Sequence, residues 1–241
     1  MPGGIYSALS GLSTQTSRID RLALDIANSA TSGYRGARSS SEVAERDSFA
    51  NTLASAVDVA PGPAESDFRA GELAPTGRSL DLAIEGPGFF SIETPGGVRY
   101  TRNGNFTLGP DGTVTTSDGC PLIGDGGAIR LPPGDFEVSA DGTFRVGRTT
   151  IGRPVVTTFD DPGQLVRTDG VRFRAPDGVV GRPDDEIGIH SGMLEHSNVQ
   201  IPERIAQLTQ ASRSFEALTR GIAVLSNDID SRAIMELGRK I

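Results

Sequence analysis

Apolar residues near both ends of the chain recur in alternating steps of four and three. The N-terminal stripe is interrupted once, by Thr16, whereas the C-terminal stripe is unbroken. This spacing is typical of a coiled-coil seam, in which each helix buries one stripe against a partner. The predicted seam positions are Ile5, Leu9, Leu12, Thr16, Ile19, Ala23 and Ile26, followed at the other end by Leu208, Ala211, Phe215, Leu218, Ile222, Leu225 and Ile229.

The flanks of these stripes indicate where the two helices begin and end. Pro202 suits the first position of a helix, because its missing N–H would have no intrahelical partner there, and Glu203 complements the helix dipole. We expect the C-terminal helix to span about residues 202–237. Gly33 is a candidate stop for the N-terminal helix. The face of that helix opposite the seam would carry Gln15, Ser17, Arg18, Arg21 and Asp25.

Between the two ends the period of the pattern changes to two. Residues 79–85 alternate polar and apolar side chains, as a half-buried strand does. Asp-Gly pairs, which favour tight hairpin turns, separate the strand-sized segments. The pattern therefore predicts a central all-β domain of short antiparallel strands. Further strands are expected at 89–93, 98–101, 106–108, 113–115, 136–138, 143–146, 155–159 and 171–173.

These patterns predict an α+β chain of four parts. Residues 1–36 would form an N-terminal helical segment, and residues 76–190 the β-domain. Residues 191–241 would carry the C-terminal helix, which we expect to pair with the first into a coiled-coil-like domain. Residues 37–75 are rich in Ser, Ala and acidic residues and have no sustained period. We interpret them as an extended connection, ordered only against a neighbour, with a possible short helix at about 49–57.

Composition and net charge exclude some classes of binding partner. The 241-residue chain has a net charge of -8, which argues against nucleic acid because phosphates require a basic face. Its single cysteine, Cys120, excludes an internal disulfide framework. The sequence has neither an apolar run long enough to span a membrane nor a secretory signal at its start. Composition alone would therefore indicate a cytoplasmic protein.

No catalytic or metal-binding pattern fits the chain. His190 and His196 lie close to Glu195, but their spacing does not match a helical metal-binding pair. The acidic pairs at 160–161 and 184–186 adjoin prolines and are interpreted as solvated turns. The Gly-rich segment 124–134 lacks the lysine of a P-loop. We expect no catalytic residues, no cofactor and no metal, although an enzyme or a binding module on the β-domain remains the alternative.

Three blocks of the chain resemble the bacterial flagellar rod and hook proteins. The first, ANSATSGYR at 27–35, is similar to the family run that closes the first helix, although the family commonly has a second Asn where this chain has Asp25. The others are LDLAIEGPGFFSIE with YTRNGNF, within 80–124, and GMLEHSNV, which opens 192–222. The residues that match the family motifs are Ala27, Asn28, Thr31, Gly33, Tyr34, Gly86, Gly88, Phe89, Phe90, Leu194, Glu195, Ser197 and Asn198.

The resemblance implies a structural subunit of the flagellar basal-body rod. It implies assembly with other rod subunits and with further copies of the chain, through the helical seams. It also implies export by the flagellar type III apparatus without signal cleavage, which replaces the cytoplasmic interpretation. No nucleic acid, membrane insertion or metal is expected. The short length and the AGELAPTGRSLDLAIEG segment resemble the proximal-rod members more than the distal-rod or hook members.

The family element Gly-x-Gly-Phe-Phe carries one further expectation. If residues 89–93 form a strand, the rings of Phe89 and Phe90 point to opposite faces of it. One ring would then lie in the β-domain core. The other would face outward, toward the connection or a neighbouring subunit.

Overall fold

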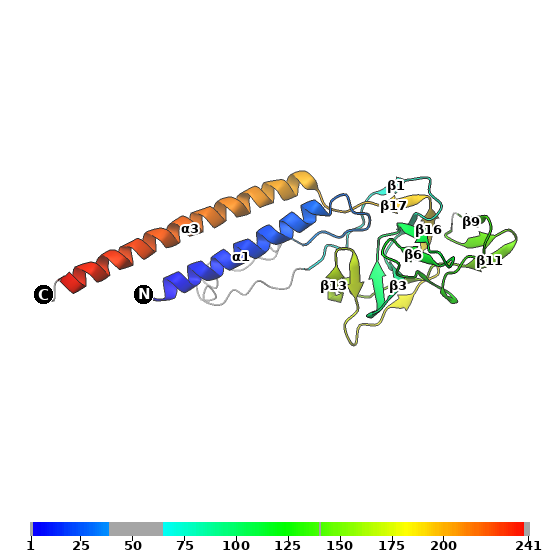
Figure 1. Cartoon of the computed structure of the whole chain (residues 1–241), viewed down its shortest axis with the longest axis horizontal. Helices are drawn as coiled ribbons and strands as arrows, with labels where there is room; N and C mark the ends of the chain where they lie inside the picture. The colour runs from blue at the N-terminus through cyan, green and yellow to red at the C-terminus, as the bar shows by residue number, and fades with distance from the viewer. Residues whose placement is uncertain (1, 39–64, 140, 239–241) are drawn as a thin grey trace. The chain divides into compact units, whose positions relative to one another are not determined.

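The computed structural model describes residues 2–38, 65–139 and 141–238 (Figure 1). These residues divide into two compact units. The helical unit comprises the described parts of 2–27, 37–38 and 200–238. The β unit comprises 28–36 together with the described residues of 65–199. The predicted short helix at 49–57 lies outside the described residues.

Two helices build the helical unit: α1 (Pro2–Ala27) and α3 (Ile201–Gly238). They run side by side in opposite directions (Figure 1). The bounds of α3 agree with the predicted 202–237 to within one residue at each end. A side chain added at Gly11 would lie 3.6 Å from Leu218 Cδ1, so the two helices meet closely at this glycine. Within the described residues, no helix combines the length and apolarity needed to cross a membrane.

The buried face of α1 differs from the predicted one. Leu22 and Asp25 are buried, whereas Thr16 and Ala23, both assigned to the seam, are exposed. The most buried positions thus lie one residue before the predicted ones. Asp25 was assigned to the polar face, but its carboxylate pairs with Arg204 of α3 at 3.2 Å. Hydropathy misplaces such a residue because an ion pair lets a charged side chain occupy a helix interface.

The predicted seam residues of α3 whose side chains are described lie among its less exposed positions. Ala211 is buried, and Leu208, Phe215, Leu218 and Ile222 are half-buried. On α1, Leu12, Ile19 and Ile26 are half-buried as well. The side chains of four further seam residues fall outside the described set: Ile5, Leu9, Leu225 and Ile229.

The β unit is built from short antiparallel strands, as predicted. Six of them form its largest sheet, in the order β13-β14-β4-β3-β12-β15, and the others form smaller sheets around it. The strands are β1 (Leu73–Pro75), β2 (Leu82–Glu85), β3 (Phe89–Thr94), β4 (Gly97–Thr101), β5 (Phe106–Leu108), β6 (Val114–Thr116), β7 (Ile123–Gly124), β8 (Gly127–Ala128), β9 (Phe136–Val138), β10 (Phe144–Val146), β11 (Thr149–Gly152), β12 (Val156–Thr158), β13 (Val166–Asp169), β14 (Arg172–Arg174), β15 (Arg182–Pro183), β16 (Gly188–Ser191) and β17 (Met193–Glu195). A 3-10 turn, η3 (Pro162–Gln164), precedes β13.

Strand β3 separates two apolar clusters. Phe90, completely buried, belongs to the main core with Leu82 and Phe106. Phe89 points to the other face and packs against Phe173 and Phe68. The prediction that the two rings face opposite sides is therefore confirmed. The outward-facing ring is nevertheless covered by this chain itself, because Phe89 is only 4% exposed.

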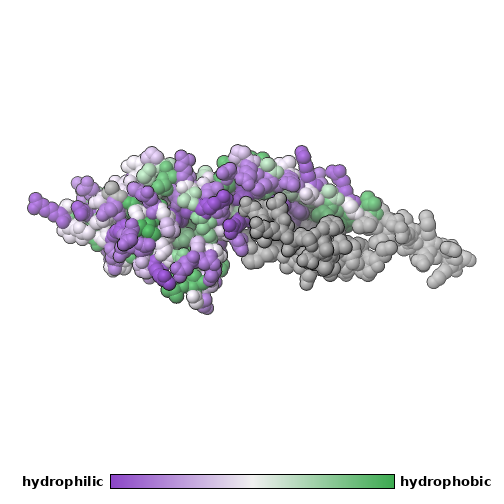
Figure 2. Space-filling model, turned by 180° about the vertical axis from the view of Figure 1, so that it is seen from behind, coloured by the Kyte–Doolittle hydropathy of each residue, from purple (hydrophilic) through white to green (hydrophobic). Residues whose placement is uncertain are grey.

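Part of the expected extended connection is built into the β unit. Strand β1 pairs with β17, so residues 73–75 join a sheet strand near the C-terminal end. Phe68 adds its ring to the cluster around Phe89. Residues 65–75 are thus ordered against the chain's own β unit rather than only against a neighbour. On the face shown in Figure 2, hydrophilic residues cover most of this unit, with small hydrophobic areas between them.

Candidate functional site

A buried ionic cluster lies where the three family-like blocks meet inside the β unit. Glu195, at the end of β17, is 1% exposed and binds two arginines. Its Oε1 lies 2.7 Å from Arg35 Nη1, and its Oε2 lies 3.3 Å from Arg102 Nη1. The backbone N–H of Gly71 also donates to Oε1, at 2.7 Å. We call Arg35, Arg102 and Glu195 the Glu195 junction.

The junction carries one more positive than negative charge, so the surrounding backbone has to compensate. Arg102 donates to the carbonyl oxygens of Ile84 and Gly86, and Arg35 donates to that of Arg69. Burial lowers the pKa of Arg102 to about 10, although the nearby carboxylate of Glu195 acts to raise it. Among the described residues, the Nε atoms of Arg35 and Arg102 have no hydrogen-bond acceptor. Removing one charged partner from such a buried cluster would leave another charge unpaired and would strongly destabilise the fold.

The turn after α1 is shaped to bring Arg35 to this cluster. Thr31 N–H donates to the Asn28 carbonyl at 3.0 Å, and Tyr34 N–H donates to the Thr31 carbonyl at 3.2 Å. Gly33 has a φ of +68°, and a Cβ there would lie 2.3 Å from the backbone of Arg102. Only glycine fits this position, because it alone tolerates both the positive φ and the close approach. Gly33 N–H then donates to the Glu195 carbonyl at 2.8 Å.

Asn198, near the end of the β unit in the sequence, binds the same turn. Its Oδ1 accepts from the backbone N–H of Gly36 at 2.8 Å. Its Nδ2 donates to the carbonyls of Asp67 and Arg69, at 2.8 and 3.0 Å. A single amide side chain thereby joins three backbone segments that are far apart in sequence. Both ends of the amide are used, so Asp or Leu at this position would lose part of the arrangement.

Arg167 of β13 completes the arrangement from outside the motif residues. Its guanidinium lies over the Tyr34 ring, 4.8 Å from the centroid, and over Phe173 at 5.1 Å. It also donates to the Arg35 carbonyl and to Ser66 Oγ. Cation–π contacts of this kind strengthen when the cation is desolvated.

The glycine-rich element before β3 also contributes to the junction. Gly88 has a φ of +123°, and a Cβ there would lie 2.6 Å from Val156 Cγ1. Gly86 supplies a carbonyl oxygen to Arg102, whose guanidinium also lies 5.5 Å from the Phe89 centroid. The element therefore joins the second apolar cluster to the charged one.

Three further motif residues take no part in the ion pairs of the junction. Leu194 is buried beside Glu195, and Ser197 Oγ accepts from the Val199 N–H at 3.2 Å. Ala27 is the last residue of α1 and is exposed. The structure thus brings residues of all three blocks together. Sequence reasoning named no role for Arg35 and Arg102, although both stand inside the quoted blocks. It missed Arg167 altogether, because no local pattern marks it.

Other titratable residues are engaged in pairwise contacts. His190 Nε2 lies 2.6 Å from Glu85 Oε2 across β16 and β2. Cys120 is buried and its thiol donates to Asp118, and burial raises the pKa of that thiol. No group of three His, Cys, Asp or Glu side chains arranged to hold a metal ion occurs in the described part of the chain.

The fold and the junction define a class of structural protein. In this class one helix precedes a β-domain in the sequence and another follows it, and contacts between the segments that enter and leave the domain stabilise it. Residues 83–146 match the model of the flagellar hook protein FlgE/F/G D1 domain. Residues 190–231 match that of the flagellar basal body rod FlgEFG protein C-terminal region.

Comparison with individual proteins covers nearly the whole chain. It is 35% identical to the flagellar basal-body rod protein FlgF of Rhizobium meliloti and 32% identical to FlgF of Caulobacter vibrioides, with 99% of both chains covered in each case. It is 28% identical to the rod protein FlgG of Bacillus subtilis, over 93% of this chain and 95% of that one. The chain belongs to the flagellar basal-body rod protein family.

Proposed function

We propose that the chain is a FlgF-type structural subunit of the proximal part of the flagellar rod, the shaft that links motor to hook, and that motility requires it. The FlgF relatives cited above match at higher identity than the FlgG relative, which supports this branch of the family. A distal-rod or hook-type axial subunit is the alternative. An enzyme or a binding module on the β unit is a more distant one.

The incomplete burial of the helical unit carries this proposal. Among its described side chains only Leu22, Asp25 and Ala211 are buried. Val224 and Ile205 are 68% and 50% exposed. A long helix gains most of its stability from packing an apolar face against something. The half-exposed seams therefore suit helices that pack against helices of other subunits.

Several finer features belong to the same proposal. The helices α1 and α3 pair in a coiled-coil-like manner, and their seam residues mediate assembly in the basal body. Export proceeds through the flagellar type III apparatus without a cleaved signal. The function requires no catalysis, cofactor, metal, nucleic acid or membrane insertion. The motif residues fix the β unit, as the contacts of Gly33, Glu195 and Asn198 within it support.

A charge placed in the α3 seam tests the proposal. In a strain that lacks the gene, a Phe215→Asp variant is expected to be exported but to leave basal bodies without a complete rod, and cells non-motile. Phe215 is half-buried, so the new carboxylate would face a packed surface in the assembly. The matched control is Ala217→Asp, at an exposed position of the same helix. Normal swimming of the Phe215→Asp strain would contradict the proposal.

A further inference from the structure

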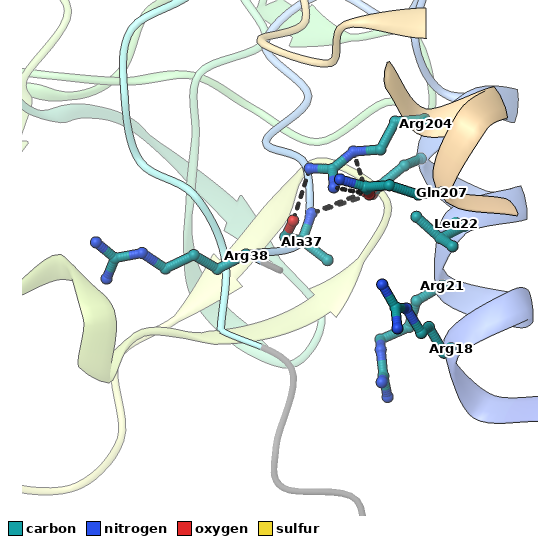
Figure 3. Close-up of a pocket in the computed structure, with 8 residues that line it drawn as sticks. Arg18, Arg21, Leu22, Ala37, Arg38, Arg204 and Gln207 are labelled. Carbon is teal, nitrogen blue, oxygen red and sulfur yellow. Dashed lines mark hydrogen bonds and ion pairs between the residues drawn. The ribbon is translucent and has the colours of Figure 1, made fainter. Parts of the chain in front are cut away.

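A small hollow in the helical unit is lined mostly by charged and polar side chains (Figure 3). The residues that matter for its charge and contacts are Arg18, Arg21 and Asp25 of α1, Ala37 of the segment after α1, and Arg204 of α3. Its volume is about 30 Å³, which is room for about two water molecules. The hollow is therefore far too small for a nucleotide or an organic cofactor, but it can take the two oxygens by which an oxyanion binds guanidinium groups.

The negative charge in the hollow is already used within the chain. Of the described residues that line it, Asp25 alone carries a carboxylate, and this residue is 1% exposed. Both carboxylate oxygens accept from the Ala37 N–H, at 3.1 and 3.2 Å. Oδ2 also lies 3.2 Å from Arg204 Nε. Asp25 therefore has little capacity left for the other cations around it.

Arg204 is equally well engaged. Its Nη1 donates to Gln207 Oε1 at 3.0 Å, and its Nη2 donates to the Ala37 carbonyl at 2.8 Å. With the Asp25 pair, each of the three guanidinium nitrogens has a partner inside the helical unit. Arg204 and Asp25 thus neutralise each other and form the fixed, buried part of the hollow.

Arg18 and Arg21 hold the unmatched charge. Their side chains lie beside each other below Ala37 in Figure 3, and no dashed line reaches either one, whereas the side chain of Arg38 extends away from them. Both are half-buried, and in the described part of the chain neither has a hydrogen bond or an ion pair. Residues three apart in a helix share one face, so these two like charges repel each other unless an anion lies between them.

We propose that this hollow is a binding site for a small dianionic oxyanion such as inorganic phosphate, held by the guanidinium groups of Arg18 and Arg21. Two unmatched cations call for two negative charges, and the guanidinium fork matches the oxygens of a phosphate in geometry. A carboxylate has the same chemistry with half the charge, so it should bind more weakly. The ion would be a structural ligand that stabilises the helical unit. The site goes beyond the proposed function and does not depend on it.

Equilibrium dialysis tests the site directly. The purified full-length chain is dialysed against radiolabelled inorganic phosphate at constant ionic strength and mildly alkaline pH, where phosphate is a dianion. We expect the parent chain to bind a single phosphate and Arg18→Gln/Arg21→Gln to bind it at least about tenfold more weakly. The matched control is Arg213→Gln/Arg220→Gln, which removes two charges at exposed positions of α3 and should bind as the parent does. No binding to the parent, or equal binding by the two double variants, would overturn the proposal.

Competition separates the two sources of an oxyanion. Unlabelled sulfate, also a dianion, should displace the bound phosphate. Acetate at the same concentration should be at least about tenfold less effective, because it offers one charge to two guanidinium groups. Acetate that displaces phosphate as well as sulfate does would contradict the assignment to a dianion.

Thermal melting tests whether the ion stabilises the helical unit. Circular dichroism at 222 nm follows the helices, and phosphate is compared with sodium chloride of equal ionic strength. Phosphate stabilises many folds by exclusion from their surface, so the difference between the parent and Arg18→Gln/Arg21→Gln is what counts. At a phosphate concentration tenfold above the dissociation constant, the parent should gain about 3–6 °C more than this variant. Arg21→Lys, which keeps the charge without the fork, should lie between them. Equal gains in all three chains would leave only the general salt effect and refute the site.

Discussion

The β unit and the helical unit differ in how completely each buries its own apolar surface. The main core of the β unit contains side chains with no exposed area, among them Phe90, Phe106 and Phe144. The described helical unit has two buried apolar residues, Leu22 and Ala211. The β unit buries its apolar core within the chain, whereas the helical unit leaves more of its apolar side chains exposed to solvent. The same substitution should therefore have different consequences in the two units.

The Glu195 junction should show the largest effect. Replacing Glu195 with Gln leaves Arg35 and Arg102 buried without a counter-charge, so we expect a loss of about 3–5 kcal/mol in the free energy of unfolding. Urea unfolding of the purified subunit measures it. The control is Glu93→Gln, which alters an exposed carboxylate on β3 and should change stability by less than about 0.5 kcal/mol. Similar stabilities of the two variants would mean that the junction is not a stabilising element.

Two Phe→Ala substitutions, one in each unit, compare directly how much each ring contributes to stability. Phe90→Ala removes a fully buried ring and should cost about 3–5 kcal/mol. Phe215→Ala removes a half-buried ring and should cost the isolated subunit roughly half as much, since part of that ring is already in water. Thermal unfolding of the subunit gives both values. Equal losses would show that the α3 seam is fully covered within one chain.

Phe89→Ala tests whether the second apolar cluster stabilises the β unit within a single chain. Its ring packs on Phe68 and Phe173 and lies near Arg102, so we expect a clear loss of thermal stability, in the range of large-to-small core changes of about 3 kcal/mol. Val98→Ala, on the adjacent strand and 45% exposed, is the control. A Phe89→Ala subunit that folds normally but assembles poorly would restore the expectation that this ring serves an interface.

The smallest effect concerns Asp118 and pH. The hydrogen bond from Arg172 is the main cause that lowers the pKa of Asp118 to about 2. A carboxylate with a lowered folded-state pKa stabilises the fold above its unfolded pKa, near 4, and loses that contribution as pH falls toward 2. Asp118 is half-exposed, so the contribution is about 0.5 kcal/mol. The stability difference between the parent chain and Asp118→Asn should thus shrink between pH 4 and 2.

The helices and most longer strands were predictable because periodicity alone determines them. The unbroken stripe from Leu208 to Ile229 predicted α3 almost to the residue. Strands β16 and β17 were missed because neither alternates, and two-residue strands such as β7 are too short to show a period. Asp25 was misplaced because its partner, Arg204, stands 179 positions further along the chain.

The junction could be located only in part. Resemblance singled out Gly33, Glu195 and Asn198, yet the sequence gives no reason why a glutamate beside two histidines should bind two arginines. That reason is spatial, since Arg35, Arg102 and Glu195 come from three distant segments. Arg167 has no local mark at all. Long-range pairs of this kind follow from topology rather than from residue pattern.

The late position of Glu195 in the chain sets the order in which the β unit can close during synthesis. Arg35 and Arg102 emerge from the ribosome early, but their shared counter-charge is residue 195 of 241. Asn198, which ties the turn after α1, follows three residues later. A fragment that stops before these residues would have to bury two cations without a carboxylate, so it is not expected to close. Prematurely terminated products would then remain open and fail to compete with complete subunits.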